Sequence, residues 1–180
     1  MKVVRTVLGL AATTLALVIT LAPTVRASET RVMLNLTSAT GVGESIGIVI
    51  LQDSEYGLLL TPDLMGIVPG IHGFHIHMHP DCGPTEKDGE TVPGLAAGDH
   101  YDPEATGNHE GPYKAGHLGD LPPLYADETG NATVPVLAPR LTIEMVKGRS
   151  LIVHRNGDNF SDDPKPLGGG GPRLACGVID

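Results

Sequence analysis

Short runs of alternating apolar and polar residues, separated by glycine and proline, occupy most of the chain after residue 28. In the first run, Val32, Leu34 and Leu36 stand at alternate positions. Because successive side chains of a strand point to opposite faces, such a run predicts a strand with one apolar face. About eight runs of this kind are present, without helical periodicity of useful length. The expected strands lie at residues 32–37, 46–50, 56–61, 74–79, 133–137, 141–146, 151–153 and 174–178. The pattern predicts an all-β antiparallel sandwich or barrel that buries one face of its sheet and wets the other.

Two segments interrupt the strand pattern. Residues 80–130 are rich in glycine, proline and acidic residues, and they contain three of the eight histidines and one of the two cysteines. A loop this long in a compact domain is either disordered or functional, and a loop braced by a metal ion would use those side chains. Residues 156–171 end in four consecutive glycines, which predicts a tight backbone turn before the last strand.

The first 27 residues have the pattern of a secretory signal peptide. Lys2 and Arg5 precede an apolar run over residues 7–21, and small or apolar residues surround a cleavage position after Ala27. This run is shorter than the stretch of about 20 residues that a membrane-spanning helix needs. We therefore expect a signal peptide over residues 1–27 and a single domain over residues 28–180. The expected location is periplasmic or secreted, without stable membrane association after cleavage.

The charge balance restricts the partners. The whole chain has a formal net charge of −9, and removal of Lys2, Arg5 and Arg26 leaves 9 basic against 21 acidic residues, a net charge of −12. A surface this acidic disfavours nucleic acid and anionic membranes. An anionic substrate would need a local positive field at the entrance of its site.

The two cysteines, Cys82 and Cys176, would be exported with the rest of the chain. An even number of cysteines in an oxidising compartment predicts one disulfide. In the chain-entropy model, closing so long a loop contributes about 4–5 kcal/mol to the free energy of unfolding.

Three histidines fall on predicted strand faces. His75 and His77 are separated by one residue, so their imidazoles point the same way while Phe74 and Ile76 point to the apolar face. His154 ends an apolar run and by the same parity lies on the face opposite to the core. A His-x-His pair alone is typical of a solvated strand face, but a third imidazole makes these residues a candidate metal site.

The long loop adds His100, His109 and His117, followed three residues later by Asp120. Three histidines and a carboxylate without a thiolate suit a four-coordinate zinc ion. Four imidazoles without sulfur suit Cu(II) in a roughly planar arrangement. The inventory therefore provides for two metal sites of different character, although spacing alone does not divide the ligands between them.

Several longer motifs resemble those of copper–zinc superoxide dismutases, over essentially the whole chain after the signal peptide. They are Gly73-Phe74-His75-Ile76-His77, Gly98-Asp99-His100-Tyr101-Asp102-Pro103, Gly116-His117-Leu118-Gly119-Asp120 and Arg173-Leu174-Ala175-Cys176-Gly177-Val178. The bacterial, exported branch of that family is resembled by Gly157-Asp158-Asn159, Ser161-Asp162 and residues 166–171. The resemblance implies an eight-stranded antiparallel Greek-key β-sandwich or barrel with long metal-binding loops. It also implies an enzyme that disproportionates superoxide to oxygen and hydrogen peroxide.

The same resemblance implies ligands for both metals. Copper would be bound by His75, His77, His100 and His154. Zinc would be bound by His100, His109, His117 and Asp120, so that His100 bridges the ions as an imidazolate. The copper would cycle between redox states, and the zinc would be structural because it has no accessible redox change. Cys82 would pair with Cys176 and tie the long loop to the last strand.

Further roles follow from the resemblance. Arg173 would stand beside the copper and receive superoxide, and His100 would donate a proton to the reduced substrate. Asp158 would link ligands of the two metals, with Asp162 and Asp163 as alternatives.

Three residues near the motifs are not expected to be ligands of either main metal site. His72 is expected to be a structural histidine bonded to backbone. His79 shares the parity of the strand pair and is expected to be a solvated neighbour, with accessory metal binding as the alternative. Lys87 would either belong to a local positive patch or be an ordinary exposed lysine.

Three alternatives to a copper–zinc dismutase are distinguished by their residues. A metal carrier would not need Arg173 or a bridging histidine, and a copper-only dismutase would lack His109, His117 and Asp120. A non-catalytic interaction module would have no reason to gather these side chains. The expected partner is superoxide, and the sequence is compatible with a monomer or a homodimer.

Overall fold

The computed structural model of the chain describes residue 2 and residues 29–180. The signal peptide predicted over residues 1–27 therefore lies outside the described residues, apart from Lys2. Within the described part of the chain, no helix is long and apolar enough to cross a membrane.

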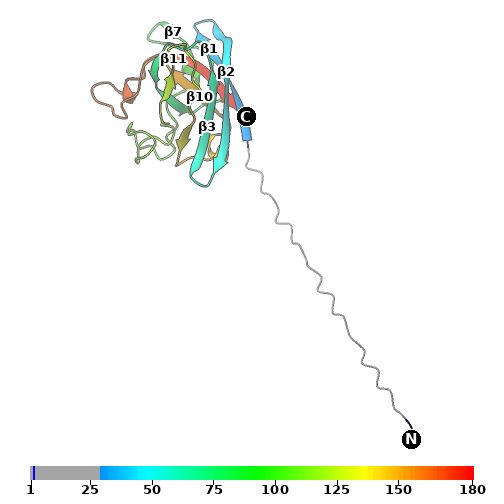
Figure 1. Ribbon diagram of the computed structural model, residues 1–180. Coiled ribbons are helices and arrows are strands. Elements are labelled where there is room, and N and C mark those ends of the chain that lie inside the picture. Colours follow the sequence, from blue (N-terminus) through cyan, green and yellow to red (C-terminus); the bar gives the residue numbers. More distant parts are fainter. Residues whose placement is uncertain (1, 3–28) are drawn as a thin grey trace.

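The alternating runs form the strands of one antiparallel sheet (Figure 1). The order of its seven strands is β5-β10-β11-β1-β2-β3-β9, and β4 with β8 and β6 with β7 form two separate two-stranded ribbons. The strands are β1 (Glu29–Ser38), β2 (Gly41–Ser54), β3 (Gly57–Leu64), β4 (Gly70–His72), β5 (Phe74–His77), β6 (Thr85–Lys87), β7 (Glu90–Val92), β8 (Leu124–Ala126), β9 (Val136–Ala138), β10 (Arg149–His154) and β11 (Arg173–Ile179). The helical elements are α1 (Ile143–Val146) and the 3-10 turns η1 (Leu95–Ala97) and η2 (Leu167–Gly169).

The sheet curls around an apolar core formed by one face of its strands. In β1, Val32 and Leu34 are fully buried, whereas Met33 between them is 59% exposed. Leu60 of β3 and Phe74 of β5 are buried in the same core. Burying a side chain of this size contributes about 1.5–3 kcal/mol. The predicted all-β antiparallel class is confirmed.

The strand list differs from the prediction in detail. The predicted strand over residues 141–146 is wrong, because α1 occupies residues 143–146. Ile143 and Val146, three residues apart, both pack into the core, whereas Met145 is 46% exposed. The N–H of Ile143 donates to Oδ1 of Asp53 (2.8 Å), which caps this helical turn. The seven strands of the sheet agree roughly with the eight that were expected, and no alternating run predicted the two short ribbons.

The long irregular segments lie against the sheet and are fastened to it. A disulfide joins Cys82 in the loop to Cys176 in β11, which confirms the predicted pairing. Backbone hydrogen bonds of 2.8–3.2 Å connect residues 99–121 to β5 and to the residue after it. Residues 168–171 turn tightly before β11, and Gly168, Gly169 and Gly171 have positive φ, as the glycine run predicted.

Candidate metal centre

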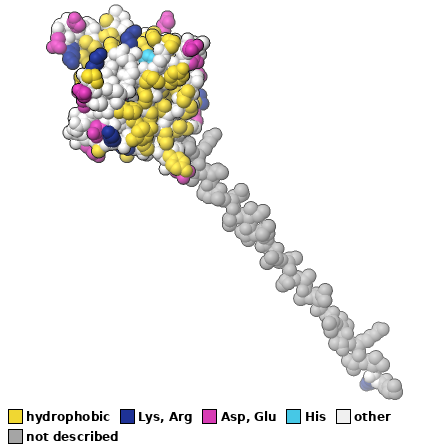
Figure 2. Space-filling view, turned by 60° about the vertical axis from the view of Figure 1, so that its left-hand side comes forward, with side chains coloured by type: hydrophobic (Ala, Val, Ile, Leu, Met, Phe, Trp, Pro, Cys, Tyr) yellow, Lys and Arg dark blue, Asp and Glu magenta, His cyan; other side chains and the backbone are white. Residues whose placement is uncertain are grey.

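Strands β5 and β10 hold three histidines on the face of the sheet opposite to the core. The two strands pair antiparallel with Ile152 opposite His75, and β10 ends at His154. His75, His77 and His154 are at most 5% exposed, and the face of the molecule drawn in Figure 2 shows only a small area of histidine side chain. The expectation that this face is wetted is therefore wrong here, because the long loop covers it.

The free edge of β5 brings the loop residues into place. The loop continues the sheet at this edge, so that His100 lies opposite His77 and Asp120 lies opposite His75. Both loop side chains are buried, with at most 2% exposed. The pairing of the loop with the edge of β5 therefore brings the side chains of His100 and Asp120 next to those of the strand.

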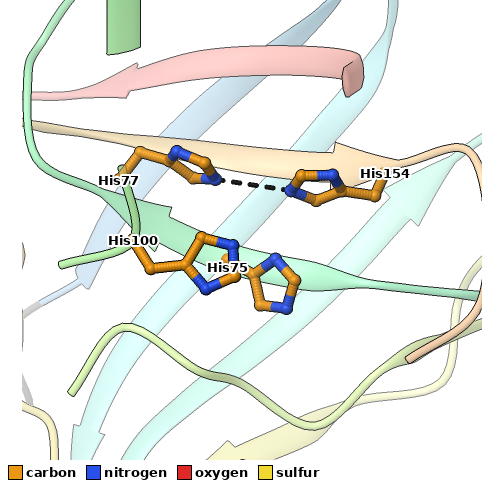
Figure 3. Close-up of side chains that lie close together, drawn as sticks. All are labelled: His75, His77, His100 and His154. Carbon is orange, nitrogen blue, oxygen red and sulfur yellow. Dashed lines mark hydrogen bonds between the residues drawn. The ribbon is translucent and has the colours of Figure 1, made fainter. Parts of the chain in front are cut away.

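His77 and His154 present their Nε2 atoms to each other (Figure 3). Nδ1 of His77 lies 2.8 Å from the carbonyl oxygen of Gly98, and Nδ1 of His154 lies 2.9 Å from that of Gly171. A carbonyl oxygen only accepts, so each Nδ1 carries the proton and each neutral ring has its lone pair on Nε2. The two Nε2 atoms are 3.3 Å apart. Two lone pairs at this distance repel each other, and a metal cation bound by both removes the repulsion.

Asp158 connects two other histidines. Its Oδ2 atom accepts a hydrogen bond from Nε2 of His75 (2.7 Å), and its Oδ1 atom accepts one from Nε2 of His109 (2.9 Å). All three side chains are fully buried. In the neutral form of each ring, these bonds place the proton on Nε2 and leave the lone pair on Nδ1. Asp162 accepts the backbone N–H of His109 instead, and Asp163 is exposed, so only Asp158 of the three candidates joins the rings.

The Oδ1 atom of Asp120 is the meeting point of three loop histidines. It lies 2.9 Å from Nδ1 of His100, 3.1 Å from Nδ1 of His109 and 3.4 Å from Nδ1 of His117. Ligand atoms bound tetrahedrally to zinc at about 2.0–2.1 Å are about 3.3–3.4 Å from one another. The separations are close to those of such a site.

His100 lies between the two groups of ligands. Its ring centroid is 3.9 Å from that of His75 and 4.9 Å from that of His77, on the strand side (Figure 3). On the loop side it is 5.4 Å from the centroids of His109 and His117. The ring of His100 therefore lies next to the strand histidines and the loop histidines at the same time.

Among the residues that the structure describes, four buried ring nitrogens have no hydrogen-bond partner. They are Nδ1 of His75, Nε2 of His100, Nδ1 of His109 and Nδ1 of His117. Nδ1 of His109 and Nδ1 of His117 lie 3.1 and 3.4 Å from Oδ1 of Asp120. For the other two atoms, remaining unsatisfied costs about 1–3 kcal/mol each. The whole free energy of unfolding of a domain is about 5–15 kcal/mol. Metal ions that accept these lone pairs would remove the cost, and imidazole nitrogens with one carboxylate suit copper and zinc.

The electrostatics keep most of these groups in the state that binds metal. Burial lowers the pKa of His75 and of His77 well below the usual value, and it lowers the pKa of His154 to about 4. These rings are therefore neutral near pH 7. Burial raises the pKa of Asp120 and of Asp158, but hydrogen bonds from histidines outweigh it and leave each pKa well below its usual range. Both carboxylates are ionised.

His109 differs from the other rings. Burial lowers its pKa, but the carboxylates of Asp120 and Asp158, 3.1 and 2.9 Å from its two ring nitrogens, outweigh this and raise the pKa to about 9. Without a metal the ring is protonated at neutral pH. A metal ion bound at Nδ1 would therefore have to displace a proton from this ring.

Arg173, in β11, lies beside the strand histidines. Its Nη2 donates to the carbonyl oxygen of Gly98 (2.6 Å) and its Nη1 to that of Gly94 (3.2 Å). Nη2 is also 3.5 Å from Nδ1 of His77. Burial lowers the pKa of Arg173 while Asp99 opposes the shift, and a guanidinium stays protonated at neutral pH.

His72, His79 and Lys87 lie outside the two groups of candidate metal ligands. The ring of His72 contacts the carbonyl oxygens of His154 (2.8 Å) and Val68 (2.7 Å), as expected of a structural histidine. His79 is exposed, as expected of a solvated neighbour. Lys87 is exposed in the β6–β7 ribbon.

Two sets of side chains bring their ligand atoms within 4.8 Å of one another. They are His75, His77, His100 and His154, and His75, His100, His109 and Asp120. The first is the set predicted for copper. The second differs from the set predicted for zinc by containing His75 in place of His117.

Sequence reasoning missed Arg140, which binds the backbone next to His117. Its Nη2 donates to the carbonyl oxygen of His117 at 2.6 Å. An arginine that follows a strand has no local pattern that would reveal such a contact.

Comparison with known proteins agrees with this geometry. Residues 45–179 match the family described as copper/zinc superoxide dismutase. A curated relative, copper–zinc superoxide dismutase 2 of Salmonella typhimurium strain LT2, is 54% identical over 155 residues, which cover 86% of this chain and 90% of the relative.

Solved structures show the same similarity. The Cu/Zn superoxide dismutase from Brucella abortus superposes with a TM-score of 0.84 at 48% identity, covering 85% of this chain and 100% of the other. The monomeric copper, zinc superoxide dismutase from Salmonella enterica gives 0.77 at 54% identity, with the same coverage. With two buried histidine groups that suit copper and zinc, the chain belongs to the copper/zinc superoxide dismutase family, whose members convert superoxide to oxygen and hydrogen peroxide.

Proposed function

We propose that His100 bridges two metal ions in this superoxide dismutase. Copper is bound by His75, His77, His100 and His154, and zinc by His100, His109, His117 and Asp120. The observation that carries this assignment is the set of four buried ring nitrogens without hydrogen-bond partners. His100 supplies one of them, and its other nitrogen lies 2.9 Å from Asp120.

The choice of His117 over His75 for zinc follows from the hydrogen bonds. Nε2 of His75 is occupied by Asp158, so its lone pair is on Nδ1 and serves the copper set. Nδ1 of His117 is buried, has no hydrogen-bond partner and lies 3.4 Å from Asp120. It therefore completes the zinc set with three imidazoles and one carboxylate.

Copper, when bound, exchanges one electron with each of two superoxide anions, so that two superoxide anions and two protons yield one oxygen molecule and one hydrogen peroxide. The chain contributes the ligand geometry and one proton. We assign that proton to Nε2 of His100, which would take it up from solvent whenever it is not bound to copper, because this atom lies in the copper set and has no hydrogen-bond partner among the described residues. Zinc has no redox change, and its proposed role is to fix the loop and the bridging ring.

Arg173 is the proposed receptor for the superoxide anion. Its guanidinium lies within 3.5 Å of the ring of His77, and two carbonyl oxygens hold it in place. A fixed positive charge at the site raises the local concentration of an anion even on an acidic protein. Lys87, exposed on the β6–β7 ribbon, would add to this field.

We also propose export to the periplasm or the medium after cleavage of residues 1–27. The disulfide supports this location, because disulfides persist in oxidising compartments. The mature chain would then be one domain over residues 28–180, as a monomer or a homodimer. Mass spectrometry of the N-terminus of the protein from a periplasmic extract tests the cleavage, and analytical ultracentrifugation tests the oligomeric state.

Metal analysis combined with superoxide consumption tests the function. We expect one copper and one zinc per chain and rapid dismutation of superoxide generated by pulse radiolysis. Both metals without turnover would indicate a metal carrier, and turnover with copper alone bound would indicate a copper-only dismutase.

A further inference from the structure

Arg140 connects the core of the protein to the turn between two of the proposed zinc ligands, His109 and His117. It lies two residues after Ala138, which ends β9, and directly before Leu141. Leu141 is only 2% exposed, and its N–H donates to the carbonyl oxygen of Ala138 (3.3 Å). The backbone at Arg140 is therefore anchored by the core, and its side chain extends to the turn formed by residues 111–117.

The guanidinium of Arg140 donates four hydrogen bonds, all to carbonyl oxygens of this turn. Nη2 donates to His117 (2.6 Å) and Gly111 (3.4 Å), Nη1 to Gly116 (3.1 Å) and Nε to Pro112 (3.1 Å). All four accepting residues are buried. Buried carbonyl groups need donors, and a single side chain satisfies four of them here.

The turn in question determines where zinc ligands stand. The N–H of His117 donates to the carbonyl oxygen of Asn108 (2.9 Å) and closes the base of the turn beside His109. The N–H of Gly111 donates to Oδ2 of Asp120 (3.3 Å). Through His117 and Gly111, Arg140 thus holds the backbone of one proposed ligand and the residue that binds the carboxylate of another.

The other side of the centre has separate supports. His75 and His77 lie on β5 and His154 lies on β10, where sheet pairing fixes the backbone. None of the hydrogen bonds of Arg140 reaches a residue of these strands.

We infer that Arg140 is a positioning residue for the zinc half of the centre. By holding the 111–117 turn, it keeps Nδ1 of His117 close to Asp120 and so preorganises the site for zinc. The inference rests on the proposed ligand assignment. Lysine cannot replace the arginine fully, because its single ammonium lacks the planar fork that spans four acceptors.

The test compares Arg140→Met with Arg140→Lys and with the control Lys114→Met. Lys114 is an exposed cation in the same turn, so its loss changes the charge without removing the fork. Zinc affinity is measured by competition with a chromophoric chelator, and Cu(I) affinity is measured the same way on zinc-loaded protein. The absorption spectrum of Co(II) in the zinc site reports the ligand geometry.

We expect Arg140→Met to weaken zinc binding about 10–100-fold, as is usual when a group supporting metal ligands is lost. Copper affinity should change much less, the Co(II) spectrum should shift, Arg140→Lys should recover part of the loss, and Lys114→Met should match the wild type. If Arg140→Met does not fold, Arg140→Lys decides the question by the same measurements.

Unchanged zinc affinity and an unchanged Co(II) spectrum would overturn the inference. An equal loss of copper and zinc binding would overturn it too, because Arg140 would then support the fold as a whole. Failure of the ligand assignment gives a different result. In that case His117→Ala leaves zinc affinity unchanged, whatever the Arg140 variants do.

Discussion

Replacing Asp158 by asparagine should affect the proposed copper site more than the proposed zinc site. The carboxylate accepts from His75 through Oδ2 and from both His109 and the N–H of Phe160 through Oδ1. An asparagine oxygen is best placed at the Oδ1 position, where it keeps two donors. The NH2 group of the asparagine then faces Nε2–H of His75. Both groups are donors, so the hydrogen bond to His75 is lost.

The substitution should therefore weaken copper binding, because His75 belongs to the proposed copper ligands. A hydrogen bond to a charged group contributes about 1.5–3 kcal/mol. Since 1.4 kcal/mol corresponds to a factor of ten, copper affinity should fall about 10–100-fold, which matches the usual effect of losing such a partner. Zinc affinity should fall less, because His109 keeps its acceptor.

Competition titrations of Asp158→Asn with copper and zinc chelators measure both affinities. Asp163→Asn is the matched control, because Asp163 is an exposed carboxylate in the same segment. Copper affinity equal to that of the wild type would show that the hydrogen bond from His75 to Asp158 does not support copper binding, and a larger loss for zinc than for copper would show the same.

Three further predictions concern the entrance, the disulfide and pH. Arg173→Ala should lower the rate of superoxide consumption and weaken its dependence on ionic strength while both metals stay bound, and unchanged kinetics would remove the arginine from the mechanism. The double substitution Cys82→Ser and Cys176→Ser should lower the free energy of unfolding in urea by up to about 4–5 kcal/mol, and an unchanged midpoint would contradict the proposed anchoring of the loop. In the metal-free protein, the pKa of His154 is about 4 when folded, compared with about 6.5 when unfolded. The stability that depends on the neutral ring is therefore present above about pH 6.5 and lost as the pH falls towards 4, and urea unfolding at pH 7, 5.5 and 4 should show a falling free energy of unfolding.

The sheet could be predicted wherever alternation alone decides the structure. In β1, burial follows the alternation of Val32, Met33 and Leu34 residue by residue. The same rule failed at residues 141–146, because Leu141, Ile143 and Met145 alternate as in a strand, whereas Ile143 and Val146 lie on one face of a helical turn. The helical turn is favoured by contacts that the local sequence does not show. Asp53 accepts the N–H of Ile143 at the start of the turn, and Met145 is exposed.

The candidate site could be predicted as an inventory but not as a geometry. Parity placed His75, His77 and His154 on one face, and the structure brings them together there. Their burial could not be predicted, because the loop that covers them has no periodic pattern. The protonated nitrogen of each ring depends on carbonyl and carboxylate partners from distant segments, such as Gly98, and these appear only in the fold.

Anomalous diffraction from crystals of the metal-loaded protein, recorded on both sides of the copper and zinc absorption edges, tests the shared imidazole most directly. We predict one zinc peak about 2.0–2.1 Å from Nδ1 of His100 and one copper peak within bonding distance of Nε2 of the same ring. A single peak, or two peaks of which either lies beyond bonding distance of His100, would contradict this prediction.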